Sequence, residues 1–566
     1  GKAVEASSAK TTFKPTAPLS EKDEEPACSA EDSIAKDVWN IYCSGRILHT
    51  VNHHRIYEDS KQFVDRPMKF HADEINRKFE AVFPLSTLIE SIDKQALTKF
   101  IEDNFEEAGN ELKDCTPVDW VEQPAKIMAI RNETLRRWAL HLHGIWKKLC
   151  KEMKPEVRDM QSRNSLIYVD QPFIVPGGRF REYYYWDAFW IVKGLLVSEM
   201  YDSVRSMLEN LASMIERVGF IPNGGRVYYL KRSQPPLFCG MVYEYYRATG
   251  NMTLVQRMLP LMEKEQEFWN INRTVAVTTP SGRTHTVYQY RAKSNVPRPE
   301  SYKEDVGIAK EAGTVKHEDR RRFYRNIASA AEAGWDFSTR WFRDRRELKS
   351  IETTNVLQAD LNAFQCWNMD IIRMLYKAAG NTSKAEEYEA KLHTFRRAMD
   401  EVFYNETEGS WFDMNMRTKG HNTRYYPSNA APLFTSCYSS IEDDKALRVY
   451  AKMAKEGVFD HPYGIPTSNV HSKQQWDHPN AWPNLNHLVI EALRKSDNAD
   501  MQEQAFVLAK KWLQGNYRVY TKNGNMWEKY HADDDKEGGG GEYKPQVGFG
   551  WTNGVVLDLL HNFNHR

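Results

Sequence analysis

Long apolar runs, net charge and recognisable metal-ligand spacings are all missing from this chain of 566 residues. No apolar run approaches the roughly 18 residues that a membrane-spanning helix needs. The 77 basic residues balance the 77 acidic ones, so no general attraction to nucleic acid is indicated. The seven cysteines contain no CxxC pair, and no His/Cys spacing indicates zinc. We therefore expect no membrane span, no nucleic-acid partner, no cofactor and no metal.

The cysteines and the start of the chain bear on its compartment. The odd cysteine count leaves at least one thiol unpaired, and Cys28 and Cys43 are close enough in sequence to be a disulfide or two reduced thiols. The positive-then-apolar pattern of a signal peptide is absent from the first residues. A secreted or extracellular glycoprotein is nevertheless the expectation, from five Asn-x-Ser/Thr sequons, at Asn132, Asn251, Asn272, Asn381 and Asn405.

Large apolar side chains are scarce in the first 35 residues, which are rich in Lys, Glu, Ser, Thr, Ala and Pro. Such a segment buries too little surface to offset the entropy cost of ordering. The composition therefore predicts a flexible N-terminal tail over residues 1–35. A single domain follows over residues 36–566.

Strand-like alternation is also scarce, and helical patterns recur from about residue 188 to the end. In the clearest one, apolar residues recur at steps of three and four, and Ser383 with Glu386 then predicts a capping box that opens the next helix. No fixed sequence period is evident, which favours a closed α/α toroid over a regular solenoid. The prediction is an all-α protein built from helical hairpins.

The segment 176–187 stands out because two glycines are followed by arginines, aromatic rings and two carboxylates. Aromatic faces with fixed polar groups suit a sugar, which has apolar C–H faces and hydroxyls. A buried aromatic turn at a helix start is the alternative interpretation. Further connections between helices also combine Trp or Tyr with Arg, Asp or Glu, which is typical of function placed on a rigid scaffold: 222–236, 297–302, 332–341, 474–482, 526–530 and 538–554.

Each of these connections also has a purely structural interpretation. Pro297–Glu300 suits a rigid surface loop, and Gly538–Gly541 suits a flexible linker. Asp336 suits a helix N-cap, and Glu528 suits a surface ion pair. Their number in one chain favours a shared site.

These segments also carry a family resemblance. Residues 176–187 resemble the first signature of the trehalases, inverting glycoside hydrolases that split trehalose. Residues 475–479 with Trp482 resemble the second signature, although Ala481 stands where glycine is usual and Pro483 where alanine is usual. Segments 48–51 and 59–65 are similar to animal trehalases. The resemblance covers about residues 40–560 and implies a single (α/α)6 toroid that hydrolyses trehalose, a small-molecule disaccharide.

The resemblance implies a role for particular residues. Asp336 would be the general acid and Glu528 the general base that activates water. Gly334 would supply a backbone contact close to the acid, and Glu542 would sit in a Gly-rich loop that closes over the substrate. The sugar-binding residues would be Arg179, Phe180, Tyr184, Trp186, Asp187, Asn223, Arg232, Ser233, Gln234, Arg298, Pro299, Glu300, Gly334, Trp482 and Glu542.

To act as the general acid, Asp336 must keep its proton although arginines lie in the same set of residues. An ordinary Asp has a pKa of about 3.9, and arginines pointing at it would lower that value. We therefore expect the arginines to face sugar hydroxyls and other carboxylates, while Trp335 and Phe337 help to desolvate Asp336. Inversion further requires the two carboxyls to stand roughly 6.5–9.5 Å apart, with a water between base and sugar.

Other functions compete with this one. A toroid glycosidase acting on another α-glucoside is the nearest alternative, and a trehalose-binding protein without catalysis is the next. The presence of both Asp336 and Glu528 argues against the second. A helical scaffold protein would leave the aromatic and charged loops without a purpose.

Overall fold

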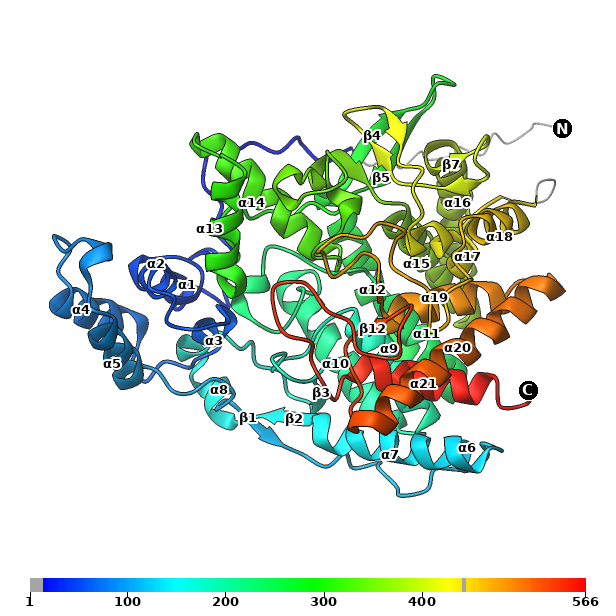
Figure 1. Ribbon diagram of the computed structural model, residues 1–566, viewed down its shortest axis with the longest axis horizontal. Helices are drawn as coiled ribbons and strands as arrows, with labels where there is room; N and C mark the ends of the chain where they lie inside the picture. Colours follow the sequence, from blue (N-terminus) through cyan, green and yellow to red (C-terminus); the bar gives the residue numbers. More distant parts are fainter. Residues whose placement is uncertain (1–13, 440–443) are drawn as a thin grey trace.

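A closed ring of helices organises the computed structural model, which describes residues 14–439 and 444–566 (Figure 1). Within these residues six helices form the inner ring, because each packs against the next and the last packs against the first. They are α9 (Asp187–Val197), α11 (Phe238–Thr249), α15 (Ala359–Ala378), α17 (Ala431–Thr435), α19 (Pro483–Arg494) and α21 (Gly550–Asn562).

A second set of helices alternates with the inner ones along the chain. Nearly every residue of α9, α19 and α21 is buried, whereas the second set buries one face only, as expected for an outer layer. The predicted (α/α)6 toroid is confirmed. The outer helices are α7 (Glu133–Leu149), α10 (Tyr201–Val218), α12 (Met252–Asn272), α16 (Thr382–Ala398), α18 (Lys445–Lys455) and α20 (Ala499–Asn523).

Additional helices lie outside the two layers of the ring. The first five helices lie at the left end of Figure 1, and α13 and α14 lie between α12 and α15 in sequence. No described helix is long and apolar enough to cross a membrane. These additional helices are α1 (Trp39–Tyr42), α2 (Arg46–His53), α3 (Lys61–Val64), α4 (Ala72–Val82), α5 (Lys94–Asn104), α6 (Ala125–Met128), α8 (Pro155–Asp159), α13 (Tyr302–Glu311) and α14 (His317–Glu332).

Strands are short and form small separate sheets in the described residues. One sheet has the order β1-β2-β3 and another β10-β9-β6, and the remaining strands pair as β4-β5, β7-β8 and β11-β12. The strands are β1 (Leu112–Asp114), β2 (Cys150–Met153), β3 (Phe173–Ile174), β4 (Thr274–Thr278), β5 (Thr284–Tyr288), β6 (Val356–Leu357), β7 (Tyr404–Asn405), β8 (Ser410–Trp411), β9 (Met414–Asn415), β10 (Gly420–His421), β11 (Asn480–Ala481) and β12 (Tyr530–His531).

The N-terminal segment differs from its prediction. Residues 1–13 lie outside the described residues, but residues 14–35 are described and attached to the domain. Cys28 is buried and bonded to Cys43, and Glu21 forms an ion pair with Arg325 at 2.7 Å. The prediction of a flexible tail is therefore wrong for residues 14–35. Composition missed this because a covalent bond and a buried ion pair add to the small apolar surface that Ala27 and Ala35 bury.

Four of the remaining five cysteines also form disulfides. Cys115 pairs with Cys150 and Cys366 with Cys437, which leaves Cys239 as a buried free thiol. The expectation of an unpaired cysteine is confirmed.

The start of α16 corrects a second prediction. The helix begins at Thr382, and the side chain of Asn381 accepts a hydrogen bond from the Lys384 N–H at 3.1 Å. Ser383 and Glu386 therefore lie inside the helix, and the predicted capping box is wrong. Asn381 is itself a strong N-cap residue two positions earlier, and it satisfies the free N–H groups first.

The aromatic and charged segments share one position in the architecture. Most of them connect the end of an outer helix to the start of the next inner helix, as 176–186 does before α9 and 526–549 before α21. Trp482 directly precedes α19, and Asp187 opens α9. The fold thus brings loops that are far apart in sequence to the N-terminal ends of the inner helices.

Candidate active site

One pocket collects nearly all of the predicted site residues. Among the described residues it is lined by both predicted catalytic carboxyls, from the loops before α15 and α21. The other predicted residues in its lining are Arg179, Phe180, Tyr184, Trp186, Asp187, Asn223, Arg232, Gln234, Arg298, Glu300, Gly334, Trp482 and Glu542. The loops therefore converge as the sequence analysis expected.

Ser233 and Pro299 are the two predicted residues that do not line this pocket. Ser233 is fully buried, and its hydroxyl donates a hydrogen bond to the Ile221 carbonyl at 2.7 Å. Its own carbonyl accepts from the Asn223 side chain at 2.9 Å. Pro299 is buried at the start of a short 3₁₀ turn, Pro299–Ser301. Both residues lie next to lining residues in the chain, and Ser233 also holds the side chain of Asn223.

Sequence reasoning missed several lining residues. Most of them lie inside the aromatic and charged segments, so their residue types already gave a signal. Ala331 gave none, because it is an alanine in the last turn of α14. The missed residues are Tyr229, Ser301, Ala331, Trp476, Tyr543, Phe549 and Trp551.

Asp336 has the environment that an acid requires. Burial raises the pKa of its carboxyl to about 6, against the opposing charge of Arg298. The nearest guanidinium nitrogen of Arg298 stands 3.6 Å from the carboxylate, beyond hydrogen-bond distance. Trp335 and Phe337 on either side are both buried. Desolvation therefore outweighs the arginine, which is the balance that the sequence analysis anticipated.

The arginines of the pocket are paired with carboxylates other than Asp336. The Arg298 guanidinium donates to Asp305 at 2.7 Å and to Glu542 at 2.9 Å. These pairings hold the arginine side chains in fixed positions and neutralise much of their charge. The remaining pairs are Arg179 with Asp59, at 2.5 and 2.9 Å, and Arg232 with Glu300.

Glu528 is held by one of its two carboxylate oxygens. Its Oε2 accepts a hydrogen bond from the Tyr543 hydroxyl at 2.7 Å. Its Oε1 is buried and accepts no hydrogen bond from the described residues, although the Lys529 ammonium lies 3.9 Å away. Burial raises the pKa of Glu528, while Lys529 and Tyr543 act in the opposite direction. The carboxyl is thus oriented on one side and available as an acceptor on the other.

Glu542 closes one side of the pocket. Its carboxylate receives two hydrogen bonds from Arg298, at 2.9 and 3.1 Å, and one from the Ser301 hydroxyl at 3.3 Å. Burial raises the pKa of Glu542 to about 8, and the neighbouring Asp305 adds to the rise while Arg298 opposes it. The like charge of the nearby Asp305 thus adds to the effect of burial in favouring the protonated form of Glu542.

Gln475 connects the loop that carries Asp336 to the loop that carries Glu528. Its amide nitrogen donates to the Asp336 carbonyl at 2.7 Å, and its amide oxygen accepts from the Lys529 ammonium at 2.5 Å. The adjacent Asp477 accepts from the Thr339 N–H at 2.8 Å and from the Ser338 hydroxyl at 3.1 Å. The second signature therefore fixes the positions of the loops that carry Asp336 and Glu528, in addition to lining the pocket.

Stacked indoles form the apolar wall of the pocket. The Trp476 and Trp482 rings are parallel, with centroids 3.7 Å apart, and the Trp186 ring lies 5.8 Å from Trp476. Gly334 packs directly against Trp186, because a Cβ at this position would lie 2.6 Å from the indole. Its φ of +80° also favours glycine. This wall offers the flat apolar surface on which a sugar ring packs.

The glycines of the 538–541 loop allow close backbone approach. A Cβ on Gly541 would lie 2.8 Å from the Gln475 side chain, and one on Gly540 would lie 2.9 Å from the Lys473 carbonyl. The Asn480 amide donates to the Gly539 carbonyl at 2.7 Å. The loop is therefore packed against the second signature, which the interpretation as a flexible linker did not foresee.

Comparison with known proteins assigns the chain that forms this pocket to a family. The sequence profile of the Trehalase family matches residues 55–564. The chain belongs to the trehalase family. The trehalase of Oryctolagus cuniculus is 41% identical over 530 residues, covering 93% of this chain and 90% of the relative. The trehalases of Homo sapiens and Apis mellifera are 40% and 39% identical and cover 96% and 93% of this chain, with 91% and 84% of their own lengths aligned.

A solved structure supports the fold independently. The neutral trehalase of Saccharomyces cerevisiae superposes with a TM-score of 0.55 at 21% identity, covering 70% of this chain and 74% of its own. At this identity the likeness concerns the architecture, which is the same helical toroid.

Proposed function

We propose that this chain hydrolyses α,α-trehalose to two glucose molecules with inversion, with Asp336 as the general acid and Glu528 as the general base. Membership of the trehalase family supports the reaction. One structural observation carries the roles: these two carboxyls, supplied by different loops, line the same pocket. Glycoside hydrolysis needs a proton donor for the departing oxygen and a base for the attacking water, and two carboxyls supply both.

In this mechanism Asp336 donates its proton to the bridging oxygen as the glycosidic bond breaks. The raised pKa of about 6 keeps that proton on the carboxyl in mildly acidic solution. Glu528 takes one proton from the water that attacks the anomeric carbon from the opposite face. One glucose leaves with the Asp336 proton and the other gains the hydroxyl, so both carboxyls return to their starting state after solvent exchange.

The arrangement around Glu528 supports its role. A base must accept a hydrogen bond from water while its orientation stays fixed. Tyr543 holds Oε2, whereas Oε1 has no hydrogen-bond donor among the described residues. Lys529 at 3.9 Å favours the ionised form that a base requires.

Three other buried polar atoms of lining residues have no hydrogen-bond partner within the described part of the chain. They are Nε of Arg232, Oε2 of Glu300 and Nε1 of Trp476. Buried polar atoms are costly unless paired, so they are suited to the hydroxyls of a sugar. The indole wall would pack against the C–H faces of the rings, and the 538–542 loop would act as the lid of a closed site.

Two charge-removing variants test the roles. We expect Asp336→Asn and Glu528→Gln each to lower kcat for glucose release from trehalose by about 10²–10⁴-fold, since each removes a proton-transfer group. Equilibrium binding of trehalose to both variants should persist, because their shapes are conserved. Asp319→Asn, at an exposed position on α14, is the matched control and should turn over normally. Normal turnover by either catalytic variant would refute that assignment.

A substrate panel separates this proposal from its alternatives. Trehalose, maltose and kojibiose contain the same sugar joined through different atoms. We expect glucose release from trehalose at a kcat/KM far above that for the other two. Preference for maltose or kojibiose would indicate another α-glucosidase, and binding without hydrolysis would indicate a sugar-binding protein.

We also propose that the chain works in an oxidising, extracellular compartment. Three disulfides support this, because reducing compartments keep thiols free. The side chains of Asn132 and Asn381 are exposed helix caps that use only their oxygen, so these two sequons are the most accessible for glycans. Mass spectrometry of protein secreted from animal cells should find six blocked cysteines and glycans at these positions. Six reduced thiols would contradict the proposal.

A further inference from the structure

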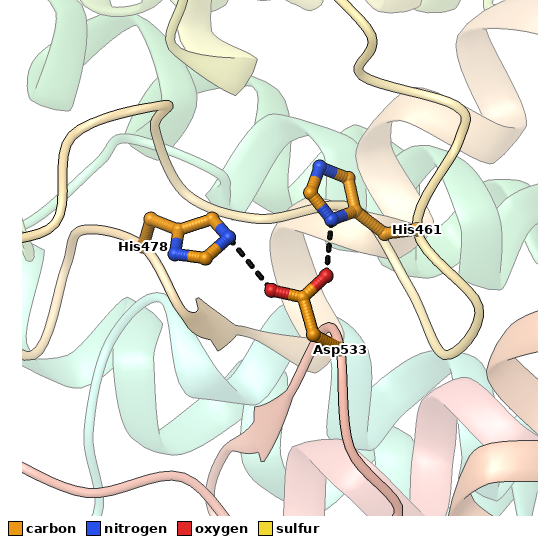
Figure 2. Close-up of side chains that lie close together, drawn as sticks. All are labelled: His461, His478 and Asp533. Carbon is orange, nitrogen blue, oxygen red and sulfur yellow. Dashed lines mark hydrogen bonds and ion pairs between the residues drawn. The ribbon is translucent and has the colours of Figure 1, made fainter.

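Outside the pocket, two histidines and an aspartate from three separate segments point toward one another (Figure 2). The Nδ1 atom of His461 lies 2.5 Å from one carboxylate oxygen of Asp533. The Nε2 atom of His478 lies 2.8 Å from the other. All three ligand atoms lie within 4.8 Å of one another. Asp533 is the most exposed of the three, so solvent ions have access.

A second cluster of similar composition is already neutralised. His487, Glu491 and Asp558 are buried together between α19 and α21. The Lys193 ammonium lies 3.7 Å from Asp558, and Arg494 binds Glu491 at 2.6 Å. Protein cations therefore already fill the role that a metal would have there. The ion pairs of Asp533 within the described residues are instead with the two imidazoles.

The donor set around Asp533 is that of a transition-metal site. Two imidazole nitrogens with one carboxylate oxygen suit Zn²⁺, whereas Ca²⁺ and Mg²⁺ prefer oxygen ligands throughout. Tetrahedral bonds of about 2.0–2.1 Å place zinc ligand atoms roughly 3.3 Å apart. The separations of 2.5 and 2.8 Å, which run to different oxygens of Asp533, are shorter than this, and one ligand atom from each residue lies within 4.8 Å of the others. Side-chain shifts of roughly 1–2 Å would therefore seat the ion.

We propose that His461, His478 and Asp533 bind a divalent first-row transition ion, Zn²⁺ in particular, as a structural site with the fourth position open to water. Each imidazole must present an unprotonated nitrogen to the ion. The proton that lies between each imidazole and Asp533 therefore moves to the far ring nitrogen or is released to solvent, and nothing is oxidised or reduced.

The surroundings of the site provide a hydrogen-bond partner for this tautomer of His478. Its far nitrogen, Nδ1, lies 3.2 Å from Nδ1 of His471, which is placed to accept a hydrogen bond. Metal-binding histidines commonly donate their other N–H to such a partner, which fixes the ring orientation. The Asp533 N–H in turn donates to Nδ1 of His531 at 3.1 Å, which orients the aspartate loop.

An ion at this position would connect the two loops that support the catalytic carboxyls. His478 directly follows Asp477, which anchors the segment after the acid. Asp533 follows β12, whose Tyr530 pairs with Ala481 of β11, and Glu528 lies two residues before that strand. A bound ion would therefore hold the second signature against the loop that carries Glu528. It stands independently of the proposed reaction.

Titration of the full chain with Zn²⁺ alone tests the site. The protein is stripped with a chelator, dialysed, and titrated with ZnCl₂ by calorimetry, with Co²⁺ absorption as a second probe of the ligands. We expect one saturable site in the wild type. His461→Ala, His478→Ala and Asp533→Asn should each weaken Zn²⁺ binding by about tenfold or more. His393→Ala, at an exposed position on α16, is the matched control and should bind as the wild type does.

A stability measurement guards against variants that simply fold poorly. Saturating Zn²⁺ should raise the thermal midpoint of the wild type and of His393→Ala, but not that of His461→Ala or Asp533→Asn. Equal Zn²⁺ affinity in the wild type and in the ligand variants would overturn the proposal, as would equal loss in the control. Glucose release by the stripped wild type, measured alongside, keeps this outcome distinct from that of the proposed reaction.

Discussion

Gly334 is subject to two constraints, a close contact with Trp186 and a positive φ, so substituting it tests how the pocket is built. We expect Gly334→Ala to cost about 2–4 kcal/mol of unfolding free energy, because the new methyl group would overlap the Trp186 indole and the φ of +80° disfavours a side chain. We also expect lower kcat/KM for trehalose, since Trp186 must move. Urea unfolding and glucose release measure the two effects.

Gly313 supplies the matched control for this substitution. It also has a positive φ, +68°, but a Cβ there would meet no atom within 4 Å. Gly313→Ala should therefore cost only the backbone strain, about 1 kcal/mol, and leave activity unchanged. If both variants lost the same stability, the contact with Trp186 would not be the reason for glycine at position 334.

The pH dependence of the reaction follows from two carboxyls with opposite requirements. In the proposed mechanism Asp336 must be protonated, so kcat/KM should fall tenfold per unit as pH rises above its pKa of about 6. Glu528 must be ionised, and burial raises its pKa, so activity should also fall on the acid side at a pH above the ordinary glutamate range. A profile of kcat/KM for trehalose against pH measures both limbs.

The variant Glu300→Gln should shift the alkaline limb of the pH profile in a known direction. Its negative charge helps to raise the pKa of Asp336, and it pairs with Arg232. Glu300→Gln removes that charge and leaves Arg232 uncompensated, so the alkaline limb should shift to lower pH. A shift to higher pH, or none, would contradict the assignment of that limb to Asp336.

Residue types and motifs predicted most of the pocket, but not the partners of its residues. Trp186, Arg298 and Glu528 stand in segments whose composition or family resemblance marks them. The pairing of Arg298 with both Asp305 and Glu542 depends on loops that meet only in three dimensions. The histidine cluster at Asp533 was missed for the same reason, because its three residues come from separate segments of the chain.

On α12, Glu265 connects an outer helix to the segment before α9. Tyr185 donates a hydrogen bond to Glu265 at 2.6 Å and accepts one from the first N–H of α11. Burial raises the pKa of Glu265 to about 7, while the Tyr185 hydrogen bond lowers it. Because the folded value lies above the unfolded one, the protonated form stabilises the fold. That stability is complete below about pH 4.5 and is lost as pH rises through 7.

Glu265→Gln should remove this loss. Glutamine keeps an acceptor for Tyr185 and does not ionise, so its advantage in unfolding free energy should grow by about 2–3 kcal/mol between pH 5 and pH 8. Urea denaturation at the two pH values measures it. Glu267→Gln, exposed on the same helix, should show no such change. An advantage that is constant with pH would mean that Glu265 is already ionised in the fold at pH 5.

Among the elements, hairpin repetition predicted the class, because buried stripes at helical spacing are local in sequence. The boundaries were less predictable. Asn381 rather than Ser383 caps α16, because both residues are good caps and the choice depends on where the preceding turn ends. The anchoring of residues 14–35 could not be predicted from composition, since Glu21 finds its partner Arg325 about 300 residues away.

Across the whole molecule, one disulfide spans neighbouring helices of the inner ring. Cys366 lies in α15 and Cys437 follows α17, at a sequence separation of 71. We expect the double variant Cys366→Ala/Cys437→Ala to lose about 4 kcal/mol, because the bond restricts the unfolded chain over a long loop. Calorimetric unfolding and the half-life of activity on heating measure the loss.

The Cys28–Cys43 bond closes only 15 residues and provides the comparison. Cys28→Ala/Cys43→Ala should lose about 3 kcal/mol, less than the longer loop, and should release the N-terminal segment without loosening the ring. A larger loss from the shorter loop would show that native packing around the N-terminal segment, rather than chain entropy, dominates.

The alternation of outer and inner helices has a consequence for how this architecture diversifies. The recognition groups sit on connectors at one rim, and these connectors also contact one another. The 538–541 loop packs against the second signature, and Gln475 binds both the Asp336 carbonyl and Lys529. Exchanging a single connector, such as 222–236, between toroids of different specificity should therefore change which saccharide is accepted and also lower the melting temperature. The reason is that Arg226 on this connector is buried in ion pairs with Glu111 at 2.6 Å and Glu182 at 3.1 Å.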